Sequence, residues 1–337
     1  MKILVENSVW TNVGNGWFSF SLYYLMKKLY PDAEVFMGEG PIDLSFRITK
    51  DYQRKNALNV LDYERADVHV FNGPIMSMLI SEYGVVIPKL IERGESYCLI
   101  SASGTNIPQE KRKALGEFLQ KYPPIFFASR DEETYNAFKD YVPVAYNGVC
   151  TATLLGRTMP NLQTFQLEKP FFISSFYTQL EPTFSVPNGE DATIENVEVE
   201  HHKTLWHLPY DIARHLNYRR NQQEEVGNKL IVRTLQNLNT KFNHINFAMP
   251  NSFISFNPIK YLEVVKSSEF TISDRVHACV ISLALGHPAR FLFETPRAGI
   301  FDRMGWDYKS NNGIMYPNME KVDEELEKLS AQIKKYI

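Results

Sequence analysis

The 337-residue chain has few cysteines and lacks a long apolar run. Its three cysteines, Cys98, Cys150 and Cys279, form no Cys-x-x-Cys pair and lie in apolar segments. This favours buried reduced thiols over a disulfide framework or a zinc site. No apolar run approaches the about 20 residues that span a bilayer, and the first residues resemble a strand rather than a signal peptide. These absences predict a cytoplasmic protein.

An excess of charge of one sign is also missing. The formal net charge of -3 predicts no general attraction to nucleic acid or to an anionic membrane. The sequence contains no P-loop lysine motif, no Gly-x-Gly-x-x-Gly, no Gly-x-Ser-x-Gly and no zincin motif. The spacing of His201, His202, His207 and His215 matches no metal motif, so we expect a solvated loop there and no resident metal.

Apolar segments of strand length alternate with helical patterns along the first half of the chain. Such alternation predicts parallel sheets covered by helices on both faces, an α/β fold. The chain is long for a single core, and turn signals near 158–168 suggest a boundary. We therefore expect one domain at residues 1–160 and a second at 168–317. The polar, irregular stretch at 178–204 predicts an insertion or a loop over a site.

The last segment, 318–337, has the pattern of an amphipathic helix. Its apolar side chains recur at helical spacing, at Val322, Leu326, Leu329 and Ile333. We expect this helix to pack against the body of the protein through that face.

The most informative segment is a polar elbow between an apolar strand and a buried helix, where Arg275 and His277 lie two residues apart. Gly286 and Pro288 end that helix. Ligands of open α/β sheets bind at the carboxyl ends of strands, and the N-termini of helices attract anions. Arginine binds carboxylate or phosphate through its planar fork, and histidine donates a proton near neutral pH. The elbow therefore predicts a site for a phosphate or a carboxylate.

A structural interpretation of the same residues stays open. Arg275 can form an ion pair with Asp274 or Glu269, and His277 can be a hydrogen-bonded histidine at a helix start. Other loops that follow strands carry further candidate binding residues, each with a turn, a cap or an ion pair as its structural alternative. These candidates are Asn12, Gly14, Asn15, Ser103, Gly104, Arg130, Arg233 and Arg297.

The elbow Ser273-Asp274-Arg275-Val276-His277, with Gly286-His287-Pro288 at the end of its helix, resembles the Arg-Leu-His signature of the polysaccharide pyruvyl transferase family. Asn12-Val13-Gly14-Asn15 is similar to the family's N-terminal Asn-x-Gly-Asp. Ser101 to Gly104 resembles its Gly-containing loop, and Ser129-Arg130-Asp131 its Arg-Asp segment. There are two departures: Asn15 replaces the family's aspartate, and Asn72-Gly73-Pro74 lacks two glycines of its turn.

The resemblance implies two Rossmann-like domains facing across a cleft, as in GT-B glycosyltransferases. It also implies transfer of a pyruvyl group from phosphoenolpyruvate to a sugar of a surface polysaccharide or its lipid-linked precursor, forming a ketal. No cofactor is implied beyond phosphoenolpyruvate as donor, and a glycolipid acceptor would bring the protein to the inner face of the membrane.

Within that reaction, Arg275 is expected to hold the phosphate or the carboxylate. His277 is expected to bind the phosphate or to act as general acid, and Arg297 or Arg233 to add a second clamp. The alternatives are a GT-B-type glycosyltransferase that uses a nucleotide sugar, and a non-catalytic member that binds a glycan.

Overall fold

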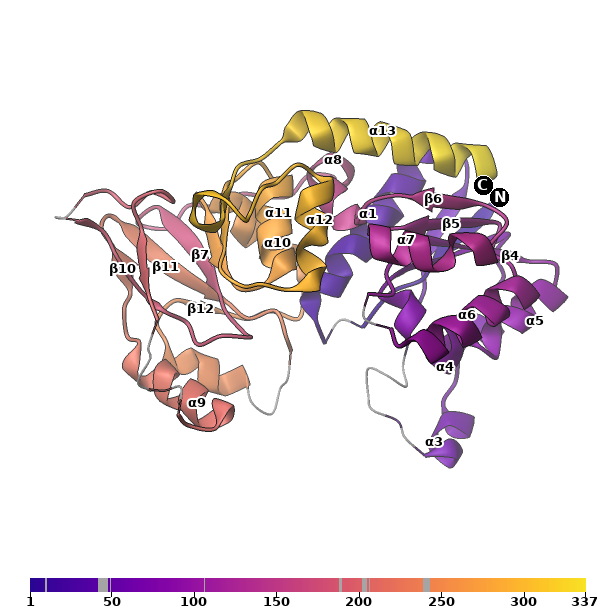
Figure 1. Cartoon of the computed structure of the whole chain (residues 1–337), viewed down its shortest axis with the longest axis horizontal. Helices are drawn as coiled ribbons and strands as arrows, with labels where there is room; N and C mark the ends of the chain where they lie inside the picture. The colour runs from indigo at the N-terminus through magenta and orange to yellow at the C-terminus, as the bar shows by residue number, and fades with distance from the viewer. Residues whose placement is uncertain are drawn as a thin grey trace. The chain divides into compact units, whose positions relative to one another are not determined.

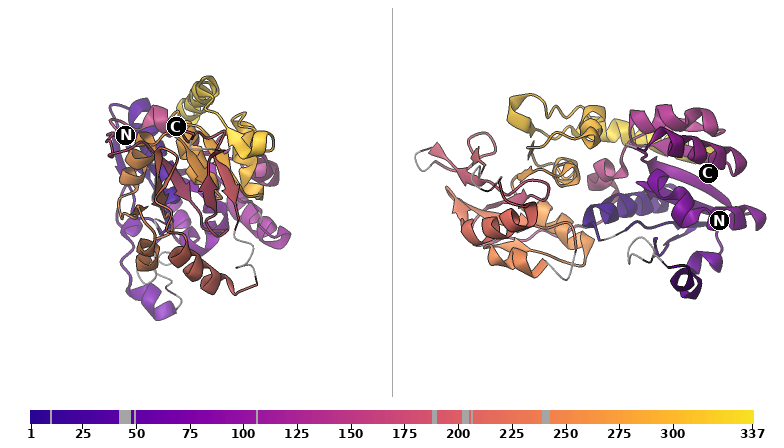
Figure 2. Two further views of the ribbon diagram at one scale, coloured as in Figure 1. Left: turned by 90° about the vertical axis from the view of Figure 1, so that its left-hand side faces the viewer. Right: turned by 60° about the horizontal axis from the view of Figure 1, so that its bottom comes forward.

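The computed structural model forms two compact α/β units (Figures 1 and 2). It describes residues 1–9, 11–41, 48, 50–105, 107–187, 190–201, 205, 207–238 and 243–337. The first unit comprises Met1–Trp10, Asn15–Pro160 and Glu320–Ile337, and the second comprises Thr11–Gly14 and Asn161–Met319. The units therefore do not follow the simple division by sequence that we expected. A short N-terminal segment belongs to the second unit, and the C-terminal helix belongs to the first.

The first unit is built on a six-stranded parallel sheet in the order β2-β1-β3-β4-β5-β6. The alternation of strands and helices in the sequence predicted this architecture correctly. Its strands are β1 (Lys2–Val5), β2 (Glu34–Met37), β3 (Val68–Gly73), β4 (Ser96–Ala102), β5 (Phe126–Ser129) and β6 (Ala145–Asn147).

Helices cover both faces of this sheet. Phe126 and Phe127 are neighbours on β5, so their side chains point to opposite faces. Phe127 packs in one cluster with Leu115 and Leu119 of α6, whereas Phe126 stacks on Tyr336 of α13, at 5.4 Å between ring centroids. The unit's helices are α1 (Val13–Leu29), α3 (Asp51–Asn56), α4 (Leu79–Tyr83), α5 (Val86–Glu92), α6 (Gln109–Lys121), α7 (Glu132–Phe138), α8 (Leu155–Thr158) and α13 (Met319–Tyr336).

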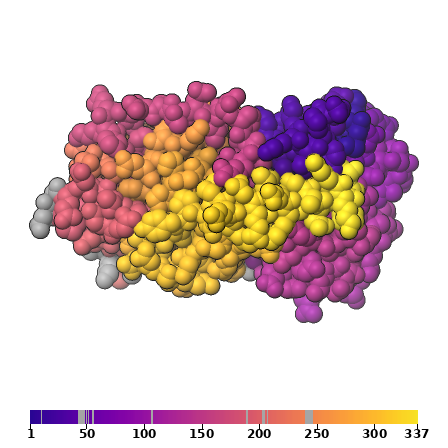
Figure 3. Space-filling view, turned by 90° about the horizontal axis from the view of Figure 1, so that it is seen from above, coloured from indigo at the N-terminus to yellow at the C-terminus, as the bar shows by residue number. Residues whose placement is uncertain are grey.

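The C-terminal helix α13 lies at the surface (Figure 3). Val322, Leu329 and Ile333 are buried, as the spacing predicted, and Leu326 is half-buried. Asp323 accepts two hydrogen bonds from the guanidinium of Arg157, at 2.6 and 2.9 Å. The helix therefore packs on the first unit through an apolar stripe flanked by an ion pair.

The second unit contains a sheet in the order β10-β11-β7-β13-β14-β15, with β12 paired to β11. The central strands are parallel, and the edge strands β10 and β15 are antiparallel to their neighbours. A separate hairpin, β8 (Thr183–Ser185) and β9 (Glu198–Glu200), lies in the stretch expected to be an insertion. The sheet strands are β7 (Phe171–Ser175), β10 (Glu225–Val226), β11 (Lys229–Thr234), β12 (Ser252–Phe253), β13 (Thr271–Ser273), β14 (Ala289–Phe291) and β15 (Ile314–Met315).

The helices of this unit are α9 (Tyr210–Arg220), α10 (Pro258–Ser267), α11 (Val276–Ala284) and α12 (Gly299–Arg303). Helix α11 follows the elbow and is buried except at His277. Its last helical residue is Ala284, and Gly286, with a φ of +92°, turns the chain so that the N–H of His287 donates to the carbonyl of Ser282 at 2.9 Å. The helix end predicted from Gly286 and Pro288 is thus confirmed.

Both sheets share one feature that locates ligand sites. In the first, β1 lies between β2 and β3; in the second, β7 lies between β11 and β13. The strand order reverses at β1 and at β7, and ligands of open parallel sheets bind at the carboxyl ends of strands at such points. The ends of β1 and β3, and of β7 and β13, are therefore the places where a site is expected.

No helix in the described ranges is long and apolar enough to cross a bilayer.

Candidate anion-binding sites

Arg275 lies at the carboxyl end of β13 and at the N-cap position of α11. Its backbone N–H donates to Oγ of Ser273 at 2.9 Å, which fixes the elbow. Its guanidinium donates from Nε to Oε1 of Gln236 at 3.2 Å, and from Nη2 to Oδ1 of Asn12 and of Asn237, both at 3.3 Å. All three acceptors are neutral amide oxygens, so they orient the guanidinium without neutralising it.

Asp274 and Glu269, the two acids that could have paired with Arg275, bind other groups. Asp274 accepts the backbone N–H groups of residues 177–179 at 2.6 to 3.2 Å. Glu269 pairs with Lys229 at 2.8 Å. Across the described ranges, no carboxylate lies within ion-pair distance of Arg275. The ion-pair interpretation left open by the sequence is therefore not what the structure contains.

Arg275 has charged neighbours of both signs. Burial lowers the pKa of its guanidinium; the charge of Asp274 opposes that shift, and the nearby charges of Arg297 and Arg214 add to it. Arg297 lies in the turn that follows β14, as the sequence suggested. Arg214, on α9, was not anticipated. Three guanidinium groups thus interact in one region of the second unit, which favours a bound anion.

The N-terminal motif is part of this region. Residues 11–14 pair with residues 236–238 beyond the end of β11: the N–H of Val13 donates to the carbonyl of Gln236 at 2.7 Å, and the N–H of Leu238 to that of Thr11 at 2.6 Å. Asn12 and Asn237 form an antiparallel bridge. This pairing explains why the segment groups with the second unit.

Asn12 and Gly14 contact the elbow directly. Oδ1 of Asn12 accepts the N–H of Gly14 at 3.2 Å as well as a hydrogen bond from Arg275. A Cβ on Gly14 would lie 3.4 Å from both Cβ and Nδ1 of His277, which places the N-terminal loop directly against the elbow. The structure thus brings together Asn12, Gly14, Arg275 and His277, which lie far apart in the sequence.

Asn15 has a different role. Its Nδ2 donates to the carbonyl of Val9 at 2.9 Å, and it groups with the first unit. A carboxylate in this position would face a carbonyl oxygen with no proton to share. The departure from the family's aspartate therefore has a local structural reason.

Arg130 is the main candidate in the first unit. It follows β5, it is 7% exposed, and its Nη1 is fully buried. No acceptor or acid among the described residues binds its guanidinium. Ser103 and Gly104, predicted with it, secure the loop to α7: Oγ of Ser103 donates to Asp131 at 3.0 Å, and the N–H of Gly104 to Oγ1 of Thr134 at 2.8 Å. A buried, unpaired guanidinium is costly unless an anion joins it.

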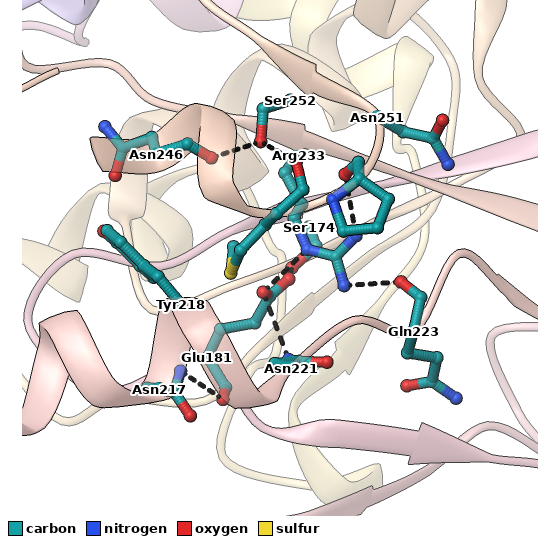
Figure 4. A network of polar contacts seen from close by, with 12 residues as sticks. Ser174, Glu181, Asn217, Tyr218, Asn221, Gln223, Arg233, Asn246, Asn251 and Ser252 are labelled. Carbon is teal, nitrogen blue, oxygen red and sulfur yellow. Dashed lines mark hydrogen bonds and ion pairs between the residues drawn. The ribbon is translucent and has the colours of Figure 1, made fainter. Parts of the chain in front are cut away.

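Arg233, expected as a second clamp, is occupied by internal contacts (Figure 4). Its Nε donates to Oε2 of Glu181 at 2.8 Å, and the two side chains are 5% and 4% exposed. Nη1 and Nη2 donate to the carbonyls of Pro250 and Gln223, at 2.9 and 2.8 Å. We therefore no longer consider Arg233 a candidate ligand of an anion. Its partner, 52 residues earlier in an irregular segment, was not recognisable from the sequence.

Sequence reasoning also missed Glu6, at the carboxyl end of β1. Its Oε1 accepts the N–H groups of Gly40 at 2.6 Å and Asn7 at 2.9 Å, while Oε2 is buried without a partner. Burial raises the pKa of this carboxyl to about 7, against the lowering effect of those two hydrogen bonds. The only feature of the sequence that pointed to Glu6 was its position, as an acidic residue directly after the first strand.

We expect Glu6→Gln to stabilise the protein in a pH-dependent way. The unfolded chain loses this proton near pH 4.5 and the folded chain near pH 7, so the native state loses stability as the pH rises between these values. The variant should match the parent at pH 4.5 and exceed it by about 3 kcal/mol above pH 8. Urea unfolding at both pH values measures this, with exposed Glu92→Gln as control. A difference that does not depend on pH would contradict the assignment.

The four histidines between residues 201 and 215 were considered as metal ligands in the sequence. His202 lies outside the described residues, and no group of three or more His, Cys, Asp or Glu side chains in the described ranges is arranged to hold a metal ion. The three cysteines are buried thiols that form no disulfide.

Comparison with known proteins agrees with this fold. Similar solved structures include S. aureus MnaA in a co-structure with UDP, with a TM-score of 0.53 and 11% identity over 99% of this chain and 91% of that chain. UDP-GlcNAc 2-epimerase from Neisseria meningitidis bound to UDP-GlcNAc gives a TM-score of 0.51 and 11% identity, over 99% of this chain and 100% of that chain. At such low identity these likenesses establish only the fold, two Rossmann-like domains of the GT-B-like type.

No protein of curated function matches the sequence. The family model described as polysaccharide pyruvyl transferase, however, matches residues 12–292. That match begins at Asn12 and includes the elbow with Arg275 and His277, the residues that the fold brings together. This chain therefore belongs to the polysaccharide pyruvyl transferase family and is a transferase.

Proposed function

We propose that the protein transfers the pyruvyl group of phosphoenolpyruvate to a sugar of a surface polysaccharide or of its lipid-linked precursor, forming a ketal. The observation that carries the proposal is Arg275, which is oriented by three neutral amides at the point where the strand order reverses. Phosphoenolpyruvate carries a phosphate and a carboxylate, and charged ligands of this kind require fixed cationic donors.

In the proposed reaction, a proton is added to C3 of phosphoenolpyruvate and positive charge develops at C2. A sugar hydroxyl attacks C2 and loses its proton. Phosphate then leaves and takes up a proton as inorganic phosphate. A second hydroxyl of the same sugar attacks C2 and loses its proton, which closes the ketal. Arg275 holds the phosphate at the start of α11, and His277, in the first turn of that helix, supplies the proton. The products are the pyruvyl ketal and inorganic phosphate.

Arg130 provides a second anion-binding position, in the first unit. Its guanidinium is buried and has no acidic partner among the described residues, which suits a charged group of a substrate. Asn15 cannot serve as a base because an amide does not accept a proton near neutral pH. A lipid-linked acceptor would bring the protein to the inner face of the membrane, as part of the same proposal.

Thermal unfolding with phosphoenolpyruvate, UDP and phosphate in parallel tests the donor. A ligand that binds only the native state at about 100 times its Kd stabilises the protein by about 2.7 kcal/mol, which shifts the melting temperature measurably. We expect phosphoenolpyruvate to raise the melting temperature more than equimolar phosphate or UDP, and His277→Ala to abolish product formation with a saccharide acceptor.

The other outcomes identify the alternatives. A shift with UDP alone would contradict the proposal and indicate a glycosyltransferase that uses a nucleotide sugar, a ligand class that two similar structures contain. Binding of phosphoenolpyruvate without turnover on any saccharide would indicate a non-catalytic member.

A further inference from the structure

Tyr177, directly beyond β7, connects two arginines from different parts of the second unit. The guanidinium carbon of Arg275 lies 5.1 Å from the centroid of the Tyr177 ring, and that of Arg214 lies 5.0 Å from it. The two guanidinium carbons are therefore at most about 10 Å apart. That limit allows a small molecule with an anionic group at each end to contact both arginines.

Tyr177 is held firmly in this position. Its N–H donates to the carboxylate of Asp274, and its carbonyl accepts a hydrogen bond from the hydroxyl of Tyr210 on α9. These contacts tie the end of β7 to the elbow on one side and to α9 on the other. The electron-rich face of the ring also favours the nearby cations.

Arg214 is oriented but not neutralised. Its Nε donates to the hydroxyl of Tyr218 at 2.6 Å, and its guanidinium lies over the Tyr218 ring, 5.4 Å from the centroid. In the described part of the chain, neither Nη of Arg214 has an acceptor, and no acid forms an ion pair with it. The arrangement leaves the planar fork available for a carboxylate or a phosphate.

We propose that Arg214 and Tyr177 complete the donor site, with Arg214 binding the carboxylate while Arg275 binds the phosphate. The division follows from position: Arg275 stands at the start of α11, where backbone N–H groups add to phosphate binding, whereas Arg214 projects from the middle of α9. Arg214 thus takes the second-clamp role that the sequence suggested for Arg233. This inference rests on the proposed function.

Calorimetric titration of the full chain with phosphoenolpyruvate and with inorganic phosphate tests the inference. For Arg214→Gln we expect phosphoenolpyruvate affinity to fall about 10- to 100-fold and phosphate affinity to change less than threefold. Arg214→Lys should recover only part of the loss, because lysine lacks the fork. Arg219→Gln, an exposed residue on the same helix, is the control and should bind both ligands like the parent.

Two results would overturn the assignment: unchanged phosphoenolpyruvate affinity in Arg214→Gln, or an equal loss for both ligands, which would place the phosphate on Arg214. A parent protein that does not bind phosphoenolpyruvate at all would instead contradict the proposed function, and so the two failures are distinguishable.

Discussion

Replacing Arg275 with glutamine should reduce phosphoenolpyruvate affinity about 10- to 100-fold and turnover by a larger factor, without destabilising the fold. The guanidinium supplies charge and a fixed fork, and its three protein acceptors are neutral amides. Removing a partly buried charge that has no acidic partner among the described residues relieves a desolvation cost, so the free energy of unfolding should stay the same or rise. Calorimetric titration and urea unfolding measure the two quantities.

The combination of lost binding and retained stability is what distinguishes a ligand-binding arginine from a structural one. Arg275→Lys should also lose affinity for phosphoenolpyruvate, since an ammonium group cannot reproduce the planar fork of the guanidinium. Exposed Arg219→Gln controls for a change in net charge. If Arg275→Gln lost stability and kept its affinity for phosphoenolpyruvate, the elbow would be structural.

Glu181→Gln should have the largest effect on stability, a loss of about 3 to 5 kcal/mol. Its carboxylate pairs with Nε of Arg233 at 2.8 Å, accepts a hydrogen bond from Nδ2 of Asn221 at 3.3 Å, and accepts another from Oγ of Ser174. Loss of this charge leaves the guanidinium of Arg233 buried without an acid. The midpoint of urea unfolding, with circular dichroism as the readout, measures the change.

Two further variants make this prediction specific. Glu225→Gln removes an exposed partner of Lys169 and should cost less than about 1 kcal/mol. The double variant Glu181→Leu/Arg233→Met should recover much of the loss, because apolar side chains often replace a buried ion pair without penalty. A small effect of Glu181→Gln would show that the buried pair is not a major stabilising contact.

The arrangement of the site could be predicted only where its parts lie close together in the sequence. The elbow at Arg275 and His277 was recognisable because a short strand, an arginine, a histidine and a helix with a Gly-x-Pro end follow one another within twenty residues. Asn12 and Gly14 were identifiable as a loop after a strand, but their contact with Arg275 depends on pairing with residues 236–238.

The arginines show most clearly what could not be predicted from the sequence. Arg233, at the end of an apolar strand, was the candidate in the sequence, yet it is buried against Glu181. Arg214, on the polar helix α9, was not a candidate, yet it lies over Tyr177, and among the described residues neither of its Nη atoms has an acceptor. Whether an arginine stays available for a ligand depends on the nearest acid in space. For Arg233 this acid is Glu181, 52 residues away in the sequence. Among the described residues, no acid binds Arg214.

The sequence alone determined the α/β class, the parallel sheets, the helix after the elbow and the family, because these follow from local patterns of apolar residues, turns and short motifs. Only the tertiary structure decided which cations remain without an acid, that residues 11–14 belong to the second unit, and that Glu6 is buried at the end of β1. The physical reason is that charge compensation and desolvation depend on distances between residues that the chain brings together only when it folds.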